Sequence, residues 1–70
     1  MSRLYYFNVV EGSRAFVDDE GEKFATADEA IARATALAHE LMRELDTAAR
    51  IVVEVVDEDG TRIAVVPGVQ

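Results

Sequence analysis

The longest regular pattern in this sequence is an apolar repeat over residues 26–46, where an apolar side chain recurs every third or fourth residue. This spacing gathers the apolar side chains on one stripe of an α-helix, and neither Gly nor Pro interrupts it. Thr26 suits the N-cap, and Glu29 completes a capping box with it. We therefore expect an amphipathic helix over residues 26–46. Its apolar stripe consists of Ala27, Ala30, Ile31, Ala34, Leu37, Ala38, Leu41, Met42 and Leu45.

The chain before this helix has the alternation of two β-strands, over residues 3–10 and 14–18. The residues between them, 11–13, contain Gly12 and predict a hairpin turn. A three-residue loop places Phe7 opposite Val17 and Val9 opposite Ala15, so that all four share one face. A two-residue loop would instead pair Phe7 with Phe16. Residues 18–22 follow as an acidic turn that leads to the helix.

The chain after the helix predicts a second hairpin, with strands over residues 51–56 and 61–66. Residues 57–60 connect these strands, and Gly60 suits the left-handed position of such a turn. A bulge at Gly60 sets Val55 opposite Ile63 and Val53 opposite Val65. These four side chains then lie on one apolar face.

Two hairpins flanking one helix predict a single α+β domain over residues 1–70. The expected fold is ββαββ: a four-stranded antiparallel sheet of order 2-1-3-4 with one helix packed on one face. This order places the two most apolar strands at the centre and the more polar strands at the edges. The alternative order places strands two and three side by side and parallel.

One helix covers only one face of such a sheet, and the other face is expected to be unusually apolar. A large exposed apolar patch is typical of an interaction site, so the sequence predicts a homodimer formed through this face or through a strand edge. The alternative is that single surface Val and Tyr side chains are ordinary and mark no site. The possible interface consists of Tyr6, Phe16, Val52, Val56, Ala64 and Val66.

The net charge of −7 and the scattered Lys and Arg side chains argue against direct nucleic-acid binding. An acidic surface favours solubility or a basic protein partner. The sequence has no cysteine, no signal peptide pattern and no apolar run long enough to cross a membrane. We therefore expect a cytoplasmic protein without disulfides and without a membrane partner.

The polar residues predict neither an active site nor a bound cofactor. Asp57, Asp59 and Gly60 match a fragment of a calcium loop, but the longer array of oxygen ligands is missing and a hairpin turn explains all three. His39 falls on the polar face of the helix, without a partner for acid–base catalysis. We expect no enzyme, no catalytic residue and no metal ligand, and keep a divalent-metal or small-molecule binding domain as the weaker alternative.

Four motifs run along the chain: Tyr5-Tyr6-Phe7-Asn8-Val9, Asp18-Asp19-Glu20-Gly21, the helical alanines Ala30, Ala34 and Ala38, and Val55-Val56-Asp57-Glu58-Asp59-Gly60. In these motifs the chain resembles a family of short acidic bacterial proteins of unknown function. The resemblance implies a shared fold and supplies no catalytic residues. The expected layout also loosely resembles antitoxin domains similar to HicB, which implies an alternative function, a regulator that binds a basic protein partner.

Overall fold

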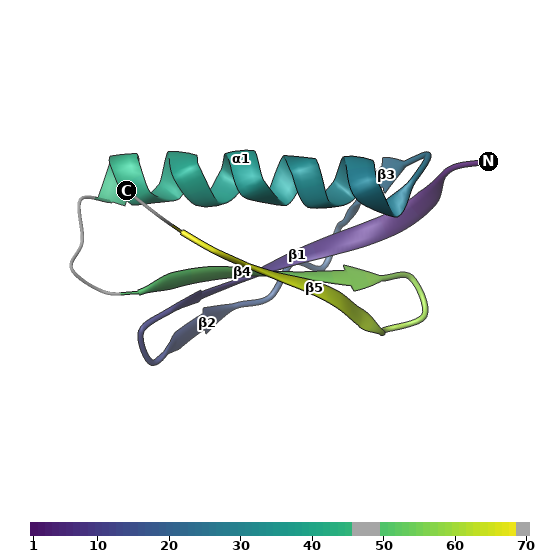
Figure 1. Ribbon diagram of the computed structural model, residues 1–70. Helices are drawn as coiled ribbons and strands as arrows, with labels where there is room; N and C mark the ends of the chain where they lie inside the picture. The colour runs from purple at the N-terminus through teal and green to yellow at the C-terminus, as the bar shows by residue number, and fades with distance from the viewer. Residues whose placement is uncertain (46–49, 69–70) are drawn as a thin grey trace.

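One helix lies along one face of an antiparallel β-sheet in the computed structural model, which describes residues 1–45 and 50–68 (Figure 1). The elements are β1 (Arg3–Glu11), β2 (Arg14–Phe16), β3 (Glu22–Phe24), α1 (Ala27–Leu45), β4 (Ile51–Asp57) and β5 (Arg62–Pro67). The predicted α+β fold is thus confirmed. The end of the helix expected at Asp46 lies outside the described residues.

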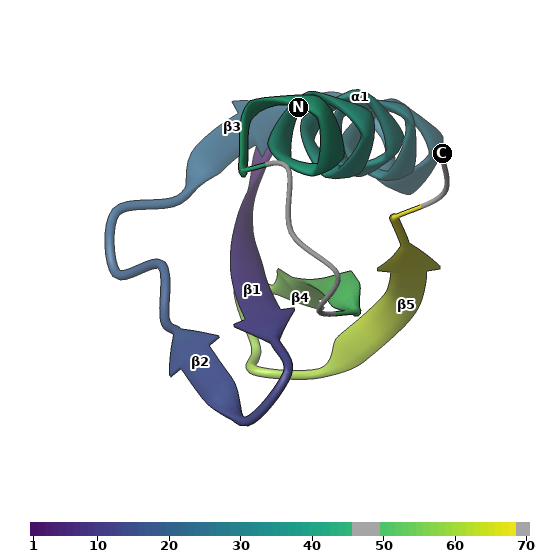
Figure 2. The same cartoon turned by 90° about the vertical axis from the view of Figure 1, so that its left-hand side faces the viewer.

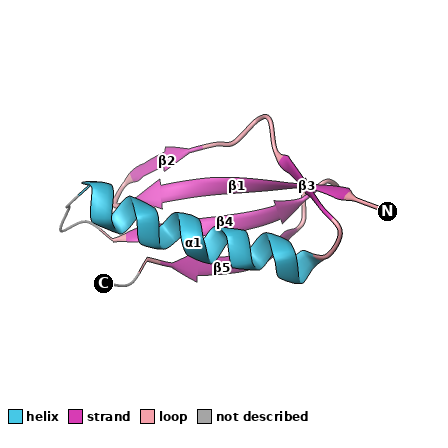
Figure 3. Ribbon diagram, turned by 90° about the horizontal axis from the view of Figure 1, so that it is seen from above, coloured by secondary structure: helices cyan, strands magenta, loops and turns pink. Residues whose placement is uncertain are grey.

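The order β2-β1-β4-β5 matches the order predicted for four strands, and every paired neighbour is antiparallel. A fifth strand, β3, was not predicted: residue Phe24 pairs with Arg3 of β1 and Glu22 pairs with Tyr5. Three residues are too few to show an alternating pattern. Tyr5 pairs with both β3 and β4, and Val9 pairs with both β2 and β4, so β2 and β3 lie along the edge of β1 opposite β4. Figure 3 shows β2, β1, β4 and β5 side by side in this order.

The helix begins as its sequence predicts. The backbone N–H of Glu29 donates to Thr26 Oγ1 at 3.2 Å, which is the N-cap bond of the predicted capping box. Ala30, Ala34 and Ala38 are completely buried, and their four-residue spacing sets them on the stripe against the sheet. Methyl side chains let the helix approach the sheet closely. Ala27 was also assigned to the stripe but is exposed.

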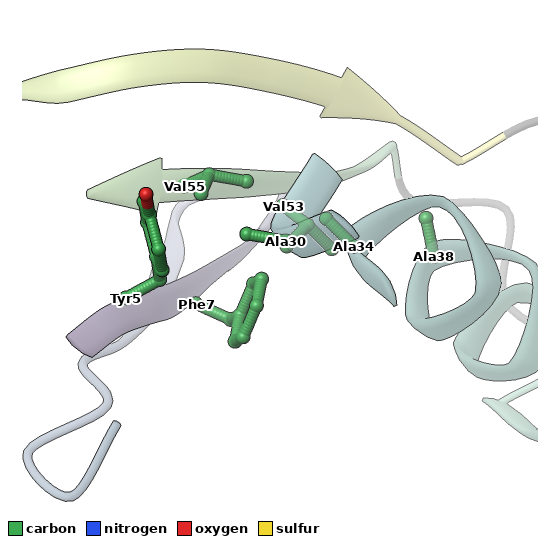
Figure 4. Close-up of a cluster of buried hydrophobic side chains, with 7 residues drawn as sticks. All are labelled: Tyr5, Phe7, Ala30, Ala34, Ala38, Val53 and Val55. Atoms are coloured by element: carbon green, nitrogen blue, oxygen red, sulfur yellow. The ribbon is translucent and has the colours of Figure 1, made fainter. Parts of the chain in front are cut away.

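The hydrophobic core lies between this stripe and the two central strands (Figure 4). Tyr5 and Phe7 of β1 and Val53 and Val55 of β4 contribute its buried strand side chains. Phe24, the last residue of β3, closes the core, with its ring edge-on to Tyr5 and Phe7 at centroid distances of 6.1 and 5.9 Å. Leu37 packs against the same cluster.

The pairing predicted for the first hairpin is wrong by one residue. Glu11 pairs with Arg14, so the loop consists of two residues, and Val9 lies opposite Phe16. Neither of the two predicted pairings, Val9 with Ala15 or Phe7 with Phe16, occurs. Gly12 has a φ of 60°, which allows this tight reversal. The shorter loop turns Phe16 toward the helix side.

The second hairpin has the predicted turn but a different pairing further along. Gly60 N donates to Asp57 O at 3.0 Å, and Val56 lies opposite Arg62. The register then shifts between Val55 and Val56, so that Val55 pairs with Ala64 and not with Ile63. This β-bulge gives β5 one residue more than β4 over the same length. In the same way Val53 lies opposite Val66 instead of Val65.

Candidate functional site

Among the described elements, none covers the face of the sheet turned away from α1 (Figure 1). We call it the outer face. Across β1 and β4 its pairs are Tyr6–Val56, Asn8–Glu54 and Val10–Val52. The register places these residues on it: Leu4, Tyr6, Asn8, Val10, Ala15, Lys23, Val52, Glu54, Val56, Arg62, Val65 and Pro67. Most of these side chains are apolar, as the sequence predicted.

The outer face carries three charged side chains, which are Glu54, Arg62 and Lys23. Glu54 is its one acidic residue in the described part of the chain, and Arg62 Nη1 lies 3.4 Å from Glu54 Oε2. Asn8 is also occupied, because its Oδ1 accepts a hydrogen bond from the N–H of Asp18 at 2.9 Å. Val65, opposite Glu54, is 49% exposed. The face thus offers a largely apolar surface, with the Glu54–Arg62 ion pair on β4 and β5 and Lys23 on β3.

Three of the six predicted interface residues do not lie on the outer face, so the prediction is wrong for them. Tyr6, Val52 and Val56 are on the outer face. Ala64 and Val66 pack against the core because the bulge in β5 reverses their direction, and Phe16 shares the helix side with Val9. Since one extra residue reverses a strand's two faces, a single slip in each hairpin accounts for all three.

A groove of about 360 Å³ opens on the helix side, between β2 and the C-terminal half of α1. Val9, Phe16 and Leu41 provide its apolar walls, and Glu11 and Arg14 line it as well. The Arg14 guanidinium lies over the Phe16 ring, 5.2 Å from its centroid. Sequence reasoning missed this groove, because Phe16 reaches it only in the observed register.

The acidic turn before β3 is held by the side chain of Asp18. Its Oδ2 accepts a hydrogen bond from Phe7 N at 3.1 Å, and its Oδ1 accepts bonds from Glu20 N and Gly21 N at 3.1 and 3.2 Å. Burial alone raises the pKa of Asp18, but the three N–H donors together lower it below its ordinary value of 3.8. Asp18 therefore works as an anionic structural acceptor.

The second acidic turn is also built around one aspartate. Asp57 Oδ1 accepts hydrogen bonds from Asp59 N and Thr61 N at 3.0 and 2.9 Å, which confirms the hairpin interpretation. Arg3 joins β1 to this turn through ion pairs with Glu58 and Asp59 at 3.0 and 3.1 Å. In the described part of the chain, no three His, Cys, Asp or Glu side chains are grouped so as to hold a metal ion.

Comparison with known proteins places the chain in a family without an assigned activity. The family model described as Domain of unknown function (DUF6894) matches residues 4–70. No curated protein and no solved structure matches the chain. Within the described residues, no helix combines the length and apolar character required to cross a membrane. The family description names no partner, so the expected dimer and the antitoxin-like alternative stay predictions.

Proposed function

The chain belongs to the DUF6894 family, and we propose that this domain is a small cytoplasmic protein-interaction module that forms a homodimer through its outer face. The observation that carries the proposal is the apolar character of that face. An antiparallel sheet covered on one side usually presents polar side chains on the other. Here Tyr6, Val10, Val52 and Val56 occupy the two central strands instead.

The distribution of charge favours a second copy of the chain as the occupant. The chain as a whole has a net charge of −7, whereas the outer face has one acidic residue in the described part of the chain, Glu54, beside Arg62 and Lys23. Two copies that meet through this largely apolar face across a two-fold axis keep most of their acidic residues apart. Self-association also supplies the additional burial that a chain of 70 residues needs.

The test uses two exposed side chains on opposite sides of the sheet. Val65 on the outer face is 49% exposed and Phe16 on the helix side is 47% exposed, so neither is essential to the core. We expect the wild type to sediment as a dimer. We expect Val65→Glu to raise the dissociation constant of the dimer at least about tenfold, because it buries a charge beside Glu54.

Phe16→Glu is the matched control, because it introduces the same side chain at similar exposure on the other side of the sheet. The control is expected to dimerise as the wild type does. Sedimentation equilibrium over a range of protein concentrations measures the dimer dissociation constants of the wild type, Val65→Glu and Phe16→Glu. A wild type that is monomeric at every concentration would contradict the proposal, and so would a loss of dimer in Phe16→Glu alone.

A further inference from the structure

The groove between β2 and α1 is separate from the outer face, and we propose that it binds a basic amphipathic segment of another protein. An apolar side chain of that segment occupies the space between Phe16 and Leu41, and its cations lie against the acidic rim. This function goes beyond self-association. The two surfaces lie on opposite sides of the sheet, so both can be occupied at once.

The apolar walls of the groove are exposed to solvent, which favours binding of an apolar side chain. Phe16 faces the helix side, yet 47% of its surface remains exposed, because β2 is only three residues long and the groove separates it from α1. The groove volume of about 360 Å³ lies within the usual range for binding cavities, about 300–1,000 Å³. Val9 and Leu41 complete a concave apolar surface of the kind that receives anchor side chains.

The side of α1 that borders the groove is acidic. Arg33 Nε lies 4.0 Å from Glu22 Oε1, so the Arg33 side of the helix faces the edge of the sheet occupied by β2 and β3. Figure 2 shows β3 rising beside the helix on this edge. Glu40 and Glu44 follow Arg33 by two and three helical turns and therefore lie on the same side.

The charge of this rim identifies the chemistry of the partner. Glu11 lines the groove, and Glu40 and Glu44 are exposed above it. The one cation that lines the groove, Arg14, lies over the Phe16 ring. A segment that presents Lys or Arg beside a large apolar side chain complements this arrangement. A helix with apolar anchors three or four residues apart has that pattern.

The experiment titrates isotope-labelled protein with a synthetic amphipathic peptide of about 12 residues, with Leu on one face and Lys on the other. We expect amide shifts at Val9, Phe16 and Leu41. Phe16→Ser should weaken binding at least about tenfold, and Glu40→Gln with Glu44→Gln about threefold or more. The control variant Val65→Ser should bind the peptide as the wild type does.

A second peptide with Glu in place of every Lys separates charge recognition from adsorption to apolar surface. We expect it to bind at least about tenfold more weakly. The proposal is overturned if the Lys peptide produces no shifts at about 1 mM. Equal binding of both peptides, or shifts confined to the outer face, would overturn it as well. Sedimentation of Phe16→Ser shows independently whether the dimer persists, so either proposal can fail without the other.

Discussion

At the scale of single residues, the side chain of Asp18 replaces backbone pairing along one edge of β1. That edge pairs with β2 at Val9–Glu11 and with β3 at Arg3–Tyr5, which leaves Phe7 N between the two strands. The Asp18 carboxylate accepts this N–H and also fixes the turn that leads to β3. The Asp18 hydrogen bonds therefore give the acidic motif Asp18-Asp19-Glu20-Gly21 a structural role.

Replacing Asp18 by Asn should lower the free energy of unfolding by about 1–3 kcal/mol at neutral pH. One amide oxygen can serve the turn, but the NH2 group cannot accept the Phe7 N–H. Because the folded pKa of Asp18 lies below 3.8, its stabilisation is present above that pH and is lost as the pH falls through the folded pKa. Urea denaturation at about pH 7 and about pH 3 should therefore show a smaller difference in unfolding free energy from the wild type at the lower pH.

Asp19→Asn is the matched control, since Asp19 is exposed in the same turn. Its unfolding free energy should stay within about 0.5 kcal/mol of the wild type at both pH values. If the difference in unfolding free energy between wild type and Asp18→Asn grew on acidification, it would contradict the role of Asp18 as an anionic acceptor.

Substitutions at two glycines with similar backbone angles distinguish the cost of a steric contact from the cost of backbone strain. Gly21 and Gly60 have φ values of 74° and 87°. A Cβ at Gly21 would lie 2.9 Å from Tyr6 Cε1, whereas a Cβ at Gly60 meets nothing within 4 Å. We expect Gly60→Ala to cost about 1–2 kcal/mol from the left-handed conformation alone, and Gly21→Ala about 1–3 kcal/mol more. Thermal denaturation compares the two, and equal costs would exclude the contact with Tyr6.

At the scale of elements, long patterns could be predicted and short ones could not. The helix and the faces of β1 and β4 follow from repeats of many residues, and they determine the core of Phe7, Val53 and Ala34. The pairing of the edge strands depends on single residues. A two-residue loop at Gly12 and a bulge near Ile63 each shift a register by one, and neither leaves a mark in the alternation of apolar residues.

The same difference between long and short patterns decides which residues of the two candidate surfaces could be predicted. Tyr6, Val52 and Val56 were predicted for the outer face correctly because they belong to the central strands. Phe16 belongs to an edge strand, so its true side and the groove that it forms could be found only in three dimensions.

Close contact between α1 and the sheet depends on the small side chain at Ala34, which is completely buried. Ala34→Leu should destabilise the protein by about 1–3 kcal/mol, because three additional carbon atoms must enter a packed interface. Ala36→Leu is the control, since Ala36 is exposed on the same helix and Leu is also a good helix former. Its effect should stay within about 0.5 kcal/mol in urea denaturation. Similar losses of unfolding free energy at Ala34 and Ala36 would contradict the close contact between the helix and the sheet.

At the scale of the whole molecule, the two proposed surfaces respond to the same net charge in opposite ways. Two copies of a chain with net charge −7 repel each other at a distance, although the faces that meet are largely apolar. A basic segment is attracted by the same field. The molecule measures only 39 × 19 × 17 Å. At 0.01 M salt the Debye length is about 30 Å, so most of the charges act together on an approaching molecule. At 0.15 M salt the Debye length is about 8 Å, and distant charges are screened.

Raising the salt concentration from about 0.01 M to about 0.15 M should therefore tighten the dimer and weaken binding of the Lys peptide, each several-fold. Sedimentation measures the first constant and peptide titration the second, in the same buffers. The double substitution Asp19→Asn with Glu20→Gln removes two exposed charges that belong to neither surface, so it should reduce both salt dependences while leaving the apolar contacts intact. If both associations weakened with salt, the outer face would be acting through ion pairs between the copies, and apolar burial would not be its driving force.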